Sequence, residues 1–140
     1  MNIVIIGCGL IGQKRAKTLA GCRLVACVDH IQEKAEALAR QFPGCVALTD
    51  WRDAISKSDV DIVIVATLHA TLTGIGLAAV QAGKHVLLEK PAGKRASELV
   101  PLIAAIEKSC GVMLDTEDVL ALSSFNKALD IVGKYGQKNS

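Results

Sequence analysis

A chain of 140 residues has the length of one ordinary domain, and 51% of its residues are hydrophobic, which is enough to fill a core. Sixteen basic and fourteen acidic residues leave a formal charge of +2, and the basic residues are scattered along the chain. We therefore expect a folded globular domain with neither a nucleic-acid partner nor a membrane-surface partner.

The first half of the chain alternates short apolar runs with helical patterns. Strands are predicted at residues 3–6, 23–28 and 45–47, and helices at residues 11–19, 32–41 and 51–56. The helix at 32–41 has the clearest signal, because Ala35, Leu38 and Ala39 recur at helical spacing with charged residues opposite.

The alternation continues in the second half. Residues 61–66 and 84–88 predict two more strands, separated by a helix at 72–81 that stops before Gly83. Ser97 is expected to cap a further helix that runs to about residue 110, with Pro101 near its start. A sixth strand is predicted at residues 111–114, and residues 117–131 have helical composition.

The strands read as continuous apolar runs, which indicates a sheet that is covered on both faces. Strands and helices that alternate through short connections predict right-handed crossovers. The sequence therefore predicts the α/β class, with a doubly wound, mostly parallel sheet in a single domain.

The cysteines and the N-terminus bear on the compartment. Five cysteines are an odd number, and none forms a CxxC pair. They predict buried, reduced thiols, as in cytosolic proteins. The first apolar run has no basic segment before it and is too short for a signal peptide or a membrane span, so we expect a cytoplasmic protein. Because His30, His69 and His85 are far apart in the sequence, no metal site is predicted.

Three glycines follow the first predicted strand and precede a helix. In such a turn, Gly7 would permit the tight bend, Gly9 would let a pyrophosphate approach the backbone, and Gly12 would let the helix pack close to the strand. The helix that begins near Leu10 and Ile11 would point its free N–H groups at the phosphates. This is the glycine pattern of a dinucleotide-binding Rossmann fold.

An acidic residue ends the second predicted strand. Asp29 could accept hydrogen bonds from the adenine-ribose hydroxyls and repel a 2′-phosphate, which favours NAD over NADP. The alternative is that Asp29 is a turn or N-cap residue before the next helix. His30 would either stack near the adenine or face solvent.

Two further segments follow the fourth and fifth predicted strands, at the same edge of the sheet as the glycine loop. The predicted cofactor contacts there are Ala66, Thr67, Leu68, His69, Glu89 and Lys90. Lys90 could hydrogen-bond a nicotinamide ribose or a substrate hydroxyl, and Pro91 would fix the turn that carries it. The alternative for Lys90 is an ordinary surface lysine.

Four segments together resemble the Gfo/Idh/MocA oxidoreductases over roughly residues 1–114: GCGLIG at 7–12, VD at 28–29, IVIVAT at 62–67 and AGKHVLLEKPAG at 82–93. The resemblance implies an NAD(P)-binding Rossmann domain and hydride transfer between the nicotinamide and a sugar or polyol carbon. It implies that the three glycines hold the pyrophosphate, that Asp29 binds the adenine ribose, and that Lys90 is a catalytic residue near the reacting hydroxyl. Residues 67–69 would line the nicotinamide side.

The chain departs from that family in two places. Thr67, Leu68 and His69 stand where the family often has Thr-Pro-Asn, so that His69 either replaces the asparagine or is a loop histidine without a ligand. The second α/β domain, which carries the family's substrate pocket, is not in this sequence. We therefore expect a dinucleotide-binding domain at 1–115, a helical segment at 116–140 that begins the missing domain, and little turnover by the chain alone.

Two other functions stay open at this point. One is a stand-alone dinucleotide-sensing module, similar to the regulatory domains of potassium transport systems, which would not need Lys90. The other is a folded remnant without catalytic activity, which forms a homodimer through a sheet edge or through a helix at 117–132. Such a helix would have an apolar face made of Leu120, Leu122, Phe125 and Leu129.

Overall fold

The computed structural model describes residues 1–19, 21–93 and 95–110. The chain divides into two compact units, Met1–Ala105 and Ile106–Ser140. All predicted site residues belong to the first unit, which contains the whole of the described sheet.

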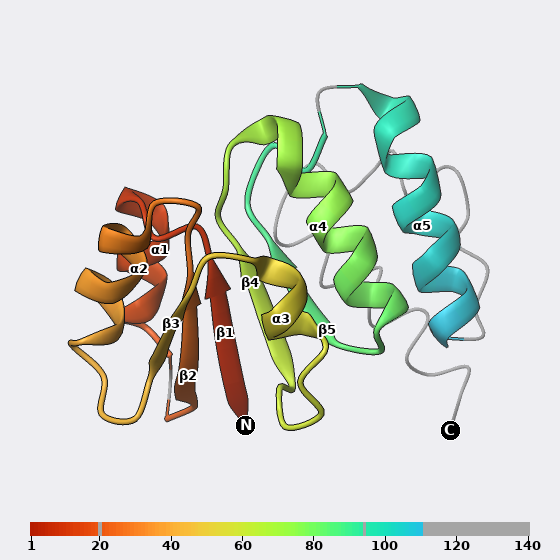
Figure 1. Ribbon diagram of the computed structural model, residues 1–140. Helices are drawn as coiled ribbons and strands as arrows, with labels where there is room; N and C mark the ends of the chain where they lie inside the picture. The colour runs from red at the N-terminus through yellow and green to blue at the C-terminus, as the bar shows by residue number, and fades with distance from the viewer. Residues whose placement is uncertain (20, 94, 111–140) are drawn as a thin grey trace. The chain divides into compact units, whose positions relative to one another are not determined.

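The first unit is built on five parallel strands (Figure 1). The strands are β1 (Asn2–Ile6), β2 (Arg23–Val28), β3 (Val46–Leu48), β4 (Ile62–Val65) and β5 (His85–Leu88), in the order β3-β2-β1-β4-β5. The helices are α1 (Leu10–Ala16), α2 (Gln32–Ala39), α3 (Trp51–Ile55), α4 (His69–Gln81) and α5 (Ala96–Cys110).

Side chains of the central strand alternate between two cores. Ile3 and Ile5 pack in a cluster with buried residues of α1 and α2, whereas Val4 and Ile6 pack in a cluster with residues of α3 and α4. Because successive side chains of a strand point to opposite faces, the two clusters lie on opposite faces of the sheet. The predicted doubly wound sheet of the α/β class is confirmed.

The position of β1 places the candidate site. It pairs with β2 on one side and with β4 on the other, so the strand order reverses direction at β1. In a doubly wound sheet, ligands bind beyond the carboxyl ends of the strands at such a switch point. The glycine loop directly follows β1.

Several predicted boundaries were wrong by a few residues. Helix α4 begins at His69 instead of residue 72, and β3 begins at Val46 instead of Cys45. Helix α5 begins at Ala96, so Ser97 lies inside its first turn and does not precede the helix as a cap. The predicted strand at 111–114, the helical segment at 117–131 and the domain boundary after residue 115 lie outside the described residues.

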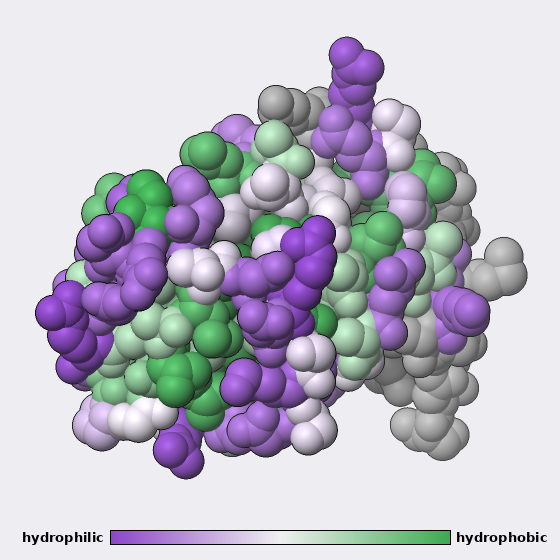
Figure 2. Space-filling view, in the orientation of Figure 1, coloured by the Kyte–Doolittle hydropathy of each residue, from purple (hydrophilic) through white to green (hydrophobic). Residues whose placement is uncertain are grey.

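The short helix α3 leaves part of one sheet face open. Figure 2 shows an apolar area over β2 and β3, where Val25 and Leu48 are partly buried and Val46 is exposed. None of the helices within residues 1–19, 21–93 and 95–110 is long and apolar enough to cross a membrane.

Candidate functional site

Gly7 occupies a position that only glycine fits. Its φ is +99°, and its N–H donates to Val28 O at 2.8 Å across the end of β2. A Cβ at this position would stand 2.5 Å from Ala66 O, beyond the end of β4. Glycine at this position therefore lets the chain leave β1 in a tight turn that passes between the ends of β2 and β4.

Gly12 is also required by the fold. A Cβ here would lie 1.9 Å from Gly7 O, well inside a van der Waals contact. Gly12 is buried in α1, and the absence of a side chain allows this helix to approach the loop that precedes it. Close helix packing is the role predicted for this glycine.

Gly9 differs from both, because nothing in the fold requires it to be glycine. Its φ of −71° is open to any residue, and a Cβ added to it would meet no atom within 4 Å. The backbone of Gly9 therefore borders open space at the start of α1.

The amides that follow Gly9 are available to a ligand. Gln13 N is bonded to Gly9 O at 3.0 Å, whereas no acceptor is recorded in the described part of the chain for the N–H groups of Leu10 and Ile11. The side chains of these two residues are exposed. A phosphate could approach the backbone here without displacing a side chain, which is the geometry that a dinucleotide requires.

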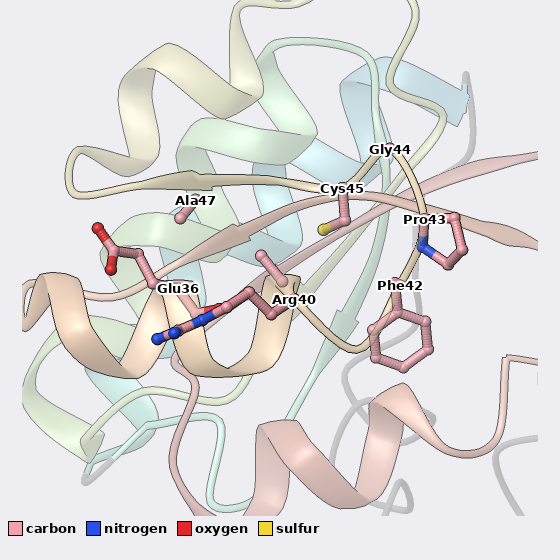
Figure 3. A pocket seen from close by; sticks show the side chains of 8 residues that line it. Glu36, Arg40, Phe42, Pro43, Gly44, Cys45 and Ala47 are labelled. Carbon is pink, nitrogen blue, oxygen red and sulfur yellow. The ribbon is translucent and has the colours of Figure 1, made fainter.

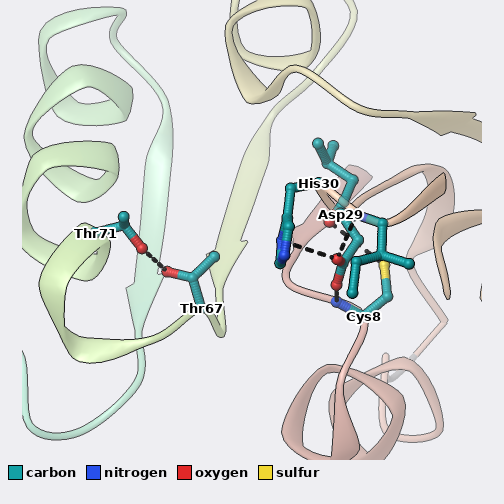
Figure 4. Close-up of polar contacts among 7 residues, drawn as sticks. Cys8, Asp29, His30, Thr67 and Thr71 are labelled. Atoms are coloured by element: carbon teal, nitrogen blue, oxygen red, sulfur yellow. Dashed lines mark hydrogen bonds and ion pairs between the residues drawn. The ribbon is translucent and has the colours of Figure 1, made fainter.

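Asp29 connects the end of β2 with the glycine loop (Figure 4). Its Oδ2 accepts a hydrogen bond from Cys8 N at 2.9 Å, and its Oδ1 accepts one from Ile31 N at 3.0 Å. Asp29 is therefore a turn residue, as the alternative interpretation held, although the N-cap of α2 is Ile31. An ionised carboxylate has about four acceptor positions. The two amides leave two of them for ribose hydroxyls, one beside His30 Nδ1 at 3.2 Å, and the Asp29 side chain is 8% exposed.

His30 lies beside this carboxylate but points into solvent. Its Nδ1 is 3.2 Å from Asp29 Oδ1, and its side chain is 83% exposed. The His30 side chain is therefore exposed to solvent, and its contact with the adenine stays a prediction.

The residues after β4 form the start of α4. Ala66 N donates to Ile6 O at 2.7 Å, which extends the contact between β1 and β4 by one residue. The Thr71 hydroxyl lies 3.0 Å from the Thr67 hydroxyl (Figure 4). Leu68 is 80% exposed at the N-cap, and His69 is the exposed first residue of α4, so His69 does not lie in a loop.

The segment after β5 is fixed by three contacts. Glu89 N donates to Val65 O at 3.0 Å, the Glu89 carboxylate forms an ion pair with Arg15 of α1, and the Thr73 hydroxyl of α4 donates to Ala92 O. The hydrogen bond to Glu89 raises the pKa of the Arg15 guanidinium above its ordinary value. Lys90 lies between these anchors and is exposed.

The fold thus brings the predicted residues to one edge of the sheet, where β1, β2, β4 and β5 end. Sequence reasoning missed Arg15, Cys8 and Thr73, which join the segments of this edge. Arg15 and Glu89 are 74 positions apart, and a single sequence contains no signal for such a pair. Within the described residues, no group of His, Cys, Asp or Glu is arranged to hold a metal ion.

A parallel sheet with an open glycine loop at its switch point and a carboxylate at the end of the next strand defines a dinucleotide-binding α/β domain. A family model described as an oxidoreductase family with an NAD-binding Rossmann fold matches residues 1–116. The chain therefore belongs to the Gfo/Idh/MocA family, and the resemblance is confirmed. The description of this family also confirms NAD as the cofactor of the family.

Curated relatives and solved structures agree with this assignment. The chain is 38% identical over 95 residues to an inositol 2-dehydrogenase of Mycolicibacterium gilvum, a match that covers 65% of this chain and 27% of that protein. Among solved structures, it is similar to GenD2 from gentamicin A biosynthesis in complex with NAD, with 30% identity and a TM-score of 0.73. An NAD binding oxidoreductase from Klebsiella pneumoniae has 29% identity and a TM-score of 0.71.

The two structural matches each cover 80% of this chain and 32% of the other chain. This chain therefore spans between a quarter and a third of the length of these relatives.

Proposed function

We propose that this chain is the NAD-binding part of an oxidoreductase that transfers a hydride between the nicotinamide and a sugar or polyol. The family supports the oxidoreductase class. The proposed substrate class is supported by curated relatives named inositol 2-dehydrogenase and by a structural neighbour described as levoglucosan dehydrogenase in complex with NADH, with 25% identity and a TM-score of 0.71.

The contrast among the three glycines carries the proposal for the cofactor. Gly7 and Gly12 are explained by contacts inside the protein, whereas the open side of Gly9 is explained by a ligand that must approach the backbone. The pyrophosphate would lie there, close to the amides of Leu10 and Ile11, which have no acceptor among the described residues.

Asp29 would select NAD over NADP. Its carboxylate is held in place by two backbone amides, and its remaining lone pairs would accept hydrogen bonds from the adenine-ribose hydroxyls. A 2′-phosphate would bring further negative charge against this carboxylate, which is repulsive. His30 is exposed beside the same position and would contact the adenosine half of the cofactor.

The other half of the cofactor would lie beyond β4 and β5. Ala66, Thr67, Leu68 and His69 would line the nicotinamide side, and Lys90 would hydrogen-bond the nicotinamide ribose or the reacting hydroxyl. When it is bound, the nicotinamide supplies the hydride chemistry, and the protein binds and orients the reactants. The ion pair of Glu89 with Arg15 would keep the Lys90 segment beside the glycine loop.

Titration calorimetry of the full chain with NADH and with NADPH tests this function. We expect saturable binding of NADH and weaker binding of NADPH. Tighter binding of NADPH would contradict the role of Asp29, and binding of neither nucleotide would favour a folded remnant. A cytoplasmic location and a homodimer stay proposals, which fractionation of cells and light scattering would test.

A further inference from the structure

Two thiols lie in contact between β2 and the residue that precedes β3. Cys27 Sγ lies 3.6 Å from Cys45 Sγ. Cys27 is fully buried, and Cys45 is half-buried. Neither residue belongs to the proposed dinucleotide site, so an inference from this pair does not depend on the proposed function.

The sheet holds these two side chains on the same face. Cys27 is in register with Ala47 of β3, and Cys45 stands two residues before Ala47. Cys45 and Ala47 both pack against the buried cluster that contains Cys27, so the two thiols lie on the same face of the sheet. A disulfide bond is about 2.05 Å long, so the sulfur atoms would have to approach each other by roughly 1.5 Å. Cys45 lies outside the strand, at the end of a turn that its N–H closes on Phe42 O at 3.1 Å.

Only one of the two thiols is open to a small solute. Cys45 lines a shallow depression of about 490 Å³ together with Glu36 of α2, with Arg40 at the C-cap of this helix, and with Phe42 and Pro43 of the following turn (Figure 3). Cys27 does not line the depression. A reagent that enters it therefore meets Cys45 first.

The two thiols also differ in their readiness to ionise. The hydrogen bond shared with Cys27 lowers the pKa of the Cys45 thiol. The same hydrogen bond, followed by a contact with Cys8 and by burial, raises the pKa of Cys27 far above its ordinary value. Cys45 is therefore the thiol of the pair that ionises more readily, and the thiolate is the nucleophilic form of cysteine.

We propose that Cys45 and Cys27 form a dithiol site that small hydroperoxides oxidise reversibly. The Cys45 thiolate attacks the outer peroxide oxygen, the O–O bond breaks, and the leaving alkoxide or hydroxide takes up a proton. Cys45 is thereby oxidised to a sulfenic acid, and the peroxide is reduced to an alcohol or water. The Cys27 sulfur then attacks the Cys45 sulfur while the proton of the Cys27 thiol passes to the sulfenic hydroxyl, which leaves as water, and the Cys27–Cys45 disulfide forms. A second thiol compound reverses the change by exchange.

Cys8 is the competing partner inside the same core. Its thiol donates to Val28 O at 3.4 Å, and it also contacts Cys27. Cys8 is fully buried, so a peroxide reaches it less readily than Cys45. A disulfide between Cys8 and Cys27 would therefore contradict the proposed order of attack.

Oxidation of the full chain with one equivalent of hydrogen peroxide, followed by peptide mapping without reduction, tests the proposal. We expect the loss of two hydrogen atoms, a single crosslink between Cys27 and Cys45, and full recovery with dithiothreitol. Cys45→Ser should abolish the crosslink, and the matched control Cys22→Ser should keep it. In Cys27→Ala, Cys45 should accumulate as a sulfenic acid that dimedone traps.

A second reagent avoids any dependence on the folding of variants. Phenylarsine oxide bridges two neighbouring thiols, so one equivalent should block two thiols of the unmodified chain and protect Cys27 and Cys45 from later alkylation. Protection of another pair, or an unchanged number of free thiols, would overturn the proposal. An unchanged crosslink in Cys45→Ser would overturn it as well.

Discussion

The Arg15 guanidinium of α1 forms an ion pair with the Glu89 carboxylate, directly before Lys90. This contact joins the helix of the glycine loop to the segment that follows β5. The side chains are 44% and 14% exposed, so the pair is partly screened by water. The Glu89 carboxylate is thus paired with Arg15 inside the protein, and its predicted contact with the cofactor stays a prediction.

Removing this ion pair should loosen the Lys90 segment with little loss of global stability. We expect Arg15→Gln and Glu89→Gln each to lower the free energy of unfolding by about 1 kcal/mol or less, because partly exposed pairs are weak. The hydrogen-exchange rates of the backbone amides in residues 88–92 should rise several-fold in each single variant. The double variant should show the same rates as the single variants. Additive effects in the double variant would show that the two side chains act independently.

Replacing Asp29 with Asn should change the choice of cofactor. Asn keeps one oxygen as an acceptor but removes the charge that would repel a 2′-phosphate. We expect the ratio of the NADPH and NADH dissociation constants to shift by about tenfold or more towards NADPH, since hydrogen bonds to a charged group contribute about 1.5–3 kcal/mol. His30→Ala serves as the control, because it alters the neighbouring exposed residue and keeps the carboxylate. An unchanged ratio in Asp29→Asn would remove Asp29 from the cofactor site.

Lys90 should matter for turnover more than for cofactor affinity. In this chain, Lys90→Ala should change the NADH dissociation constant by less than about threefold, because an exposed side chain contributes little binding energy without its substrate. In a longer relative that has this lysine, the same change should lower kcat by about a hundredfold or more. Lys34→Ala, at an exposed position on α2, is the control. Normal kcat in the relative would exclude a catalytic role.

The cap of α3 should make stability depend on pH. Asp50 accepts a hydrogen bond from Arg52 N at 2.9 Å, and this bond lowers the pKa of the carboxyl from its ordinary value of 3.8. Because the pKa of Asp50 is lower in the folded state, its ionised carboxylate stabilises the protein fully above pH 3.8. This stabilisation is lost as the pH falls through the lowered pKa. The difference in melting temperature between the wild type and Asp50→Ala should therefore be largest near neutral pH and shrink below pH 3.8. A difference that stays constant from neutral pH to below pH 3.8 would contradict this role of Asp50.

Most of the fold could be predicted from the sequence, because each signal was local. The apolar runs and the glycines that follow the first strand depend on neighbours in the chain, and they located all five described strands. Helix starts were less accurate, since α4 begins with exposed His69, a residue with no apolar periodicity to mark it. Ser97 had the right chemistry for a cap, but α5 begins one residue before it.

The connections within the candidate site could not be predicted in the same way. The contact of Cys8 N with Asp29 and the pair of Arg15 with Glu89 exist only because the sheet order brings distant segments together. The distinction among the glycines also depends on the fold, since Gly7 and Gly12 are packed against backbone and Gly9 is not. The sequence alone assigned all three to the same motif.

The affinity of Gly9→Ala for NADH, measured by calorimetry beside the stability of the same variant, tests the account most directly. A methyl group at Gly9 meets no protein atom, so the free energy of unfolding should fall by at most about 1 kcal/mol from the weaker N-cap. NADH affinity should fall at least tenfold, because the methyl group fills the space where the pyrophosphate would approach. Gly12→Ala is the matched comparison and should lose about 1–3 kcal/mol of stability through overpacking. Unchanged NADH affinity in a folded Gly9→Ala variant would contradict a dinucleotide site at this loop.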